Sequence, residues 1–123
     1  MFNEIINELF LLDKVELITC NTERKETMLT MTYTIVIDGD NVLDDIDTYK
    51  KVIAVMEVMR ELFTKRNINI SYDIKSANFL EEEIINKNNS VIKKLHAAEI
   101  IYSKDGYFEE LLENSINKTK KRA

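Results

Sequence analysis

A row of hydroxyl and amide side chains is the feature of this sequence that could form a binding surface. Two stretches alternate between apolar and polar residues, and their polar members are Thr30, Thr32, Thr34, Asn69, Ser71 and Asp73. Alternation with period two places such residues on a single face of a strand. Hydroxyl and amide groups can hydrogen-bond a ligand, but they lack the charge that a Mg²⁺ site normally needs. The row predicts either a pocket face or a solvated or helix-covered sheet face, because threonine suits an exposed strand without any function.

Nucleophilic catalysis has few candidate residues in this sequence. The chain has one cysteine, Cys20, and one histidine, His96. Cys20 lies on a short predicted strand and His96 on a helix far along the chain, so no base is expected beside the thiol. A single cysteine excludes an internal disulfide, and one cysteine with one histidine excludes a His/Cys zinc cluster.

The size and composition of the chain indicate one domain. It has 123 residues, 45% of them hydrophobic, which is enough for one core and too few for two. The N-terminus carries acids where a signal peptide needs bases, and no apolar run approaches the roughly 20 residues of a membrane span. We therefore expect a cytoplasmic protein with a single domain over residues 1–117 and a basic tail over residues 118–123.

Charge is distributed unevenly along the chain. The net charge is −5, and the tail contributes four bases and no acid: Lys118, Lys120, Lys121 and Arg122. Without these four, 13 bases stand against 22 acids, so the body carries −9. An acidic body argues against a nucleic-acid surface, because phosphate contacts need clustered lysine and arginine. Only the tail could touch nucleic acid or an acidic partner, and a frayed solubilising terminus is the favoured explanation for it.

Hydrophobic periodicity predicts four strands and five helices. The strands are expected over residues 15–20, 30–40, 67–75 and 99–102, and the helices over residues 2–13, 46–66, 79–87, 91–98 and 107–117. A short loop over residues 21–27 favours antiparallel pairing of the first two strands, whereas the intervening helix favours parallel pairing of the second and third. The order predicts an α/β sandwich with a small mixed sheet of three to four strands.

Capping residues mark where three of these helices start. Asp44 or Asp45 is expected to cap the helix over residues 46–66. Asn78, followed three residues later by Glu81, has the capping-box pattern, and Ser90 is expected to cap the next helix.

This order of elements resembles the minimal nucleotidyltransferase domain of the DNA polymerase β-like superfamily. The most similar segment is residues 79–112, FLEEEIINKNNSVIKKLHAAEIIYSKDGYFEELL. It looks like the closing section of that family, where a helix precedes a hydrophobic-Tyr-x-x-Asp pattern, occupied here by Ile100, Ile101, Tyr102 and Asp105. The resemblance implies the nucleotidyltransferase-like fold for nearly the whole chain.

The catalytic motifs of that family are not matched. Family members hold the triphosphate with a Gly-Ser pair after the first strand, and three acids on the second and third strands bind two metal ions. The corresponding positions here fall near Cys20, Asn21 and Thr22, on Thr32 and Thr34, and near Ser71. The resemblance therefore implies a catalytically degenerate member that needs no cofactor.

A shifted acidic triad is the alternative for catalysis. Asp38-Gly39-Asp40 is itself an Asp-x-Asp sequence, and Asp73 lies on the polar side of the third predicted strand. With Mg²⁺ as cofactor, these three acids would make an active nucleotidyltransferase. A turn at Asp-Gly-Asp explains the first two acids without catalysis.

Three functions follow from these observations. The first is a degenerate nucleotidyltransferase-fold protein that binds a partner protein or a second copy of itself. The resemblance implies that partner, since small relatives often pair with a helical protein encoded beside them in bacterial toxin–antitoxin or defence systems. The second is the active Mg²⁺-dependent enzyme. The third is an unrelated small α/β interaction protein of phage or plasmid origin, similar in architecture only.

Overall fold

A four-stranded mixed sheet forms the centre of the computed structural model, which describes the backbone of residues 2–121 and the side chains of residues 5–114. The strands are β1 (Val15–Lys25), β2 (Met28–Ile37), β3 (Ile68–Ser76) and β4 (Glu99–Ser103), in the spatial order β3-β2-β1-β4. β1 pairs antiparallel with both β2 and β4, and β2 pairs parallel with β3. The predicted fold class and both predicted pairing directions are confirmed.

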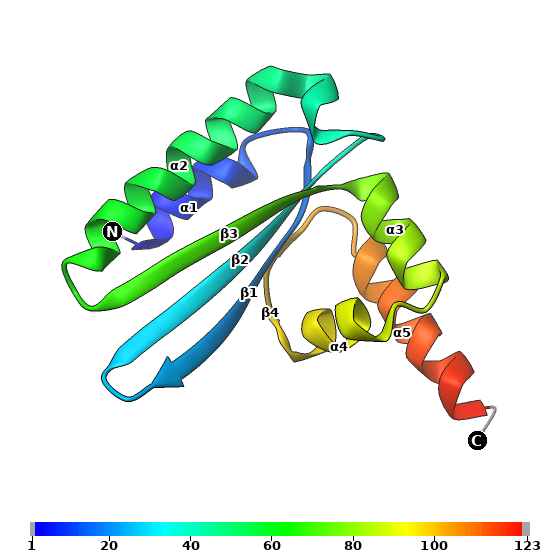
Figure 1. Cartoon of the computed structure of the whole chain (residues 1–123). Helices are drawn as coiled ribbons and strands as arrows, with labels where there is room; N and C mark the ends of the chain where they lie inside the picture. Colours follow the sequence, from blue (N-terminus) through cyan, green and yellow to red (C-terminus); the bar gives the residue numbers. More distant parts are fainter. Residues whose placement is uncertain (1, 122–123) are drawn as a thin grey trace.

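Helices cover the two faces of the sheet as separate layers (Figure 1). The first layer holds α1 (Phe2–Phe10) and α2 (Ile46–Thr64), which follows a short 3-10 helix, η1 (Val42–Asp45). The second layer holds α3 (Ala77–Ile85), α4 (Asn89–Ala97) and α5 (Tyr107–Lys121). Each layer has its own core: Tyr33 and Met56 are buried in the first, and Leu80 and Phe108 in the second.

A β-bulge at the start of β1 lets this strand serve both cores. The register with β2 shifts between Val15 and Leu17, so one extra residue, Glu16, stands between them. Val15 and Ile18 then belong to the first core, whereas Leu17 belongs to the second. The bulge therefore changes which residues of the strand face each layer.

Residues 21–27, predicted to be a loop or a hairpin end, form the end of a hairpin, and the loop alternative is wrong because β1 continues to Lys25. Asn21 faces Thr32 and Lys25 faces Met28 across the hairpin, which leaves a turn of only two residues. Glu26 in this turn has φ of 54°, as tight hairpin turns require. Backbone pairing with β2 extends the strand even though its side chains are polar, since the ladder satisfies the backbone groups.

Helix ends differ from the sequence prediction at several points. α1 stops at Phe10 and Leu11 is exposed, so the predicted extension to residue 13 is wrong. Asp45 caps α2 as predicted, accepting hydrogen bonds from the Thr48 backbone N–H at 3.2 Å and its hydroxyl at 2.8 Å. These bonds hold the pKa of the Asp45 carboxyl below its ordinary value.

The caps predicted for α3 and α4 are wrong by two residues each. Ser76 caps α3, its hydroxyl accepting from the Phe79 backbone N–H at 3.2 Å. Asn78 instead donates its side-chain amide to Asp40. Asn88 rather than Ser90 caps α4.

The first residues of the predicted C-terminal tail belong to the last helix, α5. α5 runs to Lys121, so Lys118, Lys120 and Lys121 lie in its last turns, and Arg122 lies outside the described residues. Among the helices of residues 2–121, none is long and apolar enough to cross a membrane.

Candidate functional site

The predicted polar row does lie on one face of the sheet. Neighbouring members face each other across β2 and β3 in the pairs Thr30–Asn69, Thr32–Ser71 and Thr34–Asp73. The second layer covers only one end of this row. Thr34 is buried, Thr30, Thr32 and Ser71 are half-buried, and Asn69 and Asp73 are exposed. The row is therefore a shallow polar surface, open toward the β1–β2 hairpin.

The structure does not bring Asp38, Asp40 and Asp73 together. Asp38 and Asp40 follow the end of β2, where Ile37 faces Ser76 of β3. Asp73 lies three residues before Ser76, which is about 10 Å along an extended strand. Residues 5–114 contain no group of three histidine, cysteine, aspartate or glutamate side chains placed to hold a metal ion. The geometry therefore gives no support to the shifted triad.

Asp38 instead joins an acidic pocket at one end of the second layer. Its other acidic lining residues are Glu16, Glu81, Asp105 and Glu110. Burial raises the pKa of the Glu16 carboxyl above its ordinary value of 4.5, and the negative charges of Asp38 and Asp105 add to this, while Lys104 opposes it. The sequence analysis missed this pocket because its residues come from separate elements.

Replacing Glu16 with glutamine should give a pH-dependent gain in stability. Because the pKa of Glu16 is raised in the folded state, its ionised form opposes folding above that pKa, and its protonated form below 4.5 does not. Glu16→Gln should therefore raise the free energy of unfolding at neutral pH by about 0.5 kcal/mol, a small effect because solvent screens the site. The gain should shrink as the pH falls through the raised pKa. Urea unfolding of both chains at neutral and acidic pH measures this, and an equal difference at both pH values would contradict it.

Cys20 and His96 lie apart and form no catalytic pair. Cys20 is buried in the first core, where burial raises the pKa of its thiol. Its sulfur lies 3.9 Å from the Thr22 hydroxyl. His96 is exposed in the last turn of α4, in the other layer. The Cys20 side chain serves as a small core residue.

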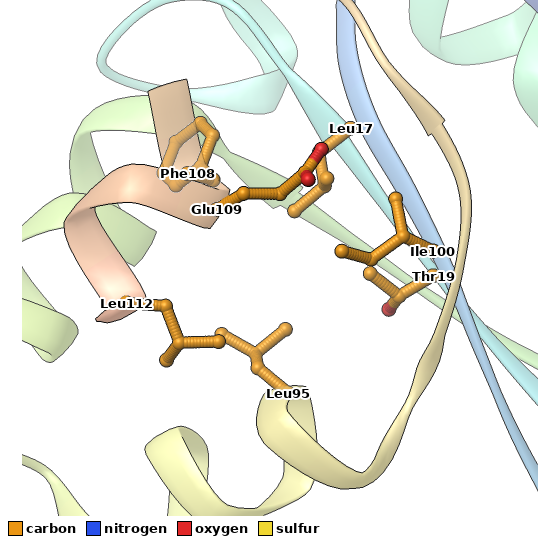
Figure 2. Close-up of a pocket in the computed structure, with 7 residues that line it drawn as sticks. All are labelled: Leu17, Thr19, Leu95, Ile100, Phe108, Glu109 and Leu112. Atoms are coloured by element: carbon orange, nitrogen blue, oxygen red, sulfur yellow. The ribbon is translucent and has the colours of Figure 1, made fainter. Parts of the chain in front are cut away.

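A narrow apolar groove opens between α4 and α5 in the second layer (Figure 2). Phe108 and Leu112 of α5 lie on one side, and Thr19 of β1 and Ile100 of β4 lie on the other. Leu17 of β1 lies at the upper end in this view, and Leu95 of α4 lies at the lower end beside Leu112. The groove is open on one side and has a volume of about 10 Å³, or about 250 Å³ when the open space at its mouth is counted. A volume of about 10 Å³ is the lower limit for one water molecule, so only the tip of a side chain could enter it. The groove therefore suits an inserted side chain better than a free ligand.

Thr19 places an unsatisfied hydroxyl against this apolar groove. The residue is only 2% exposed, and its Oγ1 atom has no hydrogen-bond partner. An orphaned buried hydroxyl is unfavourable, since it loses its hydrogen bonds to water and gains none in the fold. Asn21, two residues further along β1, donates its side-chain amide to the Lys94 carbonyl oxygen at 3.0 Å and ties the strand to α4. The Thr19 hydroxyl thus lies beneath the apolar surface of the groove and is not exposed to a group bound there.

The mouth of the groove carries an exposed apolar residue and an acid. Ile100 is 43% exposed, although it belongs to a strand, and Glu109 stands at the rim. The sequence analysis predicted Phe108 and Leu112 as inward residues of the last helix, and Phe108 is buried as predicted while Leu112 is partly buried. It missed Thr19, whose position depends on the bulge in β1.

Fold and site together define a mixed α/β sandwich with an apolar groove in its second layer. No family model, curated protein or solved structure matches this chain. The resemblance to nucleotidyltransferases therefore stays a prediction.

Proposed function

We propose that this chain works by binding a protein through the apolar groove of its second layer. The observation that carries the proposal is an open groove lined by leucine, isoleucine and phenylalanine, with Ile100 43% exposed at its mouth. A groove with room for the end of one side chain is the kind of pocket that accepts an apolar anchor from a protein partner.

The polar row is consistent with binding in place of phosphoryl transfer. Thr32 and Ser71, which stand where the resembled family has acids, are direct neighbours across β2 and β3. Their hydroxyls can hydrogen-bond but cannot supply the negative charge that holds two metal ions. A degenerate nucleotidyltransferase-like fold would keep this geometry without its metals. By the resemblance, we propose that the chain and its partner protein form a cytoplasmic pair of the toxin–antitoxin or defence type.

Two variants test this function in the full chain. Ile100→Glu places a charge at the mouth of the groove, whereas Val58→Glu places one on α2 in the opposite layer, where Val58 is similarly exposed at 48%. Tagged wild-type, Ile100→Glu and Val58→Glu chains are incubated with extract of the native host, and the retained proteins are identified by mass spectrometry. We expect wild type and Val58→Glu to retain the same protein, an untagged copy of the chain included, and Ile100→Glu to lose it.

Equal retention by all three chains would contradict this function. So would a Mg²⁺-dependent thermal shift with ATP, GTP, CTP or UTP that disappears in Asp38→Asn, because bound nucleotide raises the unfolding temperature by mass action. Circular dichroism of each variant confirms that the comparison is made between folded chains.

A further inference from the structure

The end of α5 is the segment of this chain that could occupy such a groove. The first turns of α5 pack on α3 and β4, with Phe108 buried and Leu111 and Leu112 partly buried. The second half of the helix then leaves the molecule beyond α4 (Figure 1). Helices of this length are stabilised mainly by packing of an apolar face, and propensity contributes less. The projecting half would therefore gain stability from a surface to pack on.

The two halves of α5 carry opposite charges in the sequence. Glu109, Glu110 and Glu113 belong to the first half, and Lys118, Lys120 and Lys121 belong to the second. Within one helix this order suits the macrodipole. Two such helices lying side by side in antiparallel directions also place the acidic half of each against the basic half of the other, whereas a parallel pair places like charges together.

The second half of α5 also has the composition that the groove calls for. The groove presents an apolar lining with the Glu109 carboxylate at its rim, so it calls for an apolar residue and nearby positive charge. The sequence of the helix from residue 116 reads Ile-Asn-Lys-Thr-Lys-Lys, which offers one apolar residue, an amide, a hydroxyl and three positive charges.

We propose that the occupant of the groove is a second copy of this chain. In each copy the second half of α5 lies antiparallel along the first half of the other copy's α5 and over its groove. Twofold symmetry repeats every contact between the two helices, so each contact adds twice to the free energy of dimerisation. This inference rests on the proposed function and names its protein partner as the chain itself.

Sedimentation of the full chain tests for this dimer. At about 100 µM and low ionic strength we expect a dimer, and added salt should raise its Kd because exposed charge pairs are screened. A purified wild-type chain that stays monomeric under these conditions overturns the inference.

Charge-swapped variants test how the two copies meet. One variant reverses the acids (Glu109→Lys with Glu113→Lys), and the other reverses the bases (Lys118→Glu, Lys120→Glu and Lys121→Glu). Each alone should raise the dimer Kd about tenfold or more, since every pair becomes repulsive. Mixed in equal amounts, the two variants should form a heterodimer, because one α5 then carries five positive charges against the single acid Glu110, and the other carries only negative charges.

A matched control reverses two exposed bases in the first layer, Lys50→Glu with Lys51→Glu on α2, and should leave the dimer Kd unchanged. An equal loss of dimer in this control, or a mixture of the swapped variants that stays monomeric, would overturn the antiparallel arrangement. A monomeric chain whose retained protein still depends on Ile100 would overturn the dimer alone and leave the proposed function in place.

Discussion

Ile35→Ala should lower the free energy of unfolding by about 3 kcal/mol, as large-to-small substitutions in well-packed cores do. Ile35 is fully buried in the middle of β2, with Ile18 of β1 on one side and Ile74 of β3 on the other. It also belongs to the core beneath α1 and α2. Strands on both sides and helices above restrict how far the site can collapse, so a cavity should remain.

Chemical denaturation measures this effect, and an exposed isoleucine supplies the matched control. Ile85 lies on α3 and is 57% exposed, so Ile85→Ala makes the same chemical change without opening a cavity. The control should change the free energy of unfolding by less than about 0.5 kcal/mol. If Ile35→Ala shifted the midpoint no further than Ile85→Ala, the first core would not be packed as described.

Thr19→Val should make the free chain more stable, by about 1 to 2 kcal/mol, because it removes an unsatisfied buried hydroxyl. Valine has nearly the shape of threonine and is equally suited to a strand, so packing around the site should be preserved. The gain is expected only because the Thr19 hydroxyl has no partner in the fold. A loss of stability in Thr19→Val would show that the hydroxyl is satisfied.

Thr32→Val is the control for this substitution. Thr32 lies on the same face of the sheet but is half-buried, so solvent can satisfy its hydroxyl and no comparable gain is expected.

The same pair of variants separates an effect on folding from an effect on binding. Because the Thr19 hydroxyl is not exposed to the groove, Thr19→Val should stabilise the free chain and leave the association with the occupant unchanged. Thr32→Val should leave the association unchanged.

The antiparallel and parallel pairings of the strands follow from local features of the sequence. Alternation with period two identified β2 and β3, and the short link before β2 and the helix after it set the two directions. The same alternation placed Thr32 and Ser71 on one face, because side chains of a strand must point to alternate sides. These features depend on neighbours within a few residues, which is why they can be read without a structure.

The candidate site was only partly predictable, because only some of its residues are related by spacing within one element. Phe108 and Leu112 follow the helical spacing of the last helix, and that spacing predicted them as inward residues. The acids of the second-layer pocket, among them Glu16 and Asp105, come from separate elements, and no spacing relates them. The alternative triad of Asp38, Asp40 and Asp73 is not brought together, because Asp73 stands three residues before the end of its strand.

The sequence by itself determined the order of the elements, the directions of the strands and the polar face of the sheet. Tertiary structure alone decided the length of β1, the bulge at Glu16 and the groove between α4 and α5. The bulge changes which face Leu17 meets, and with it the position of the Thr19 hydroxyl. Such features depend on register and on how helices far apart in the sequence pack together, and residue types at fixed spacing do not encode either.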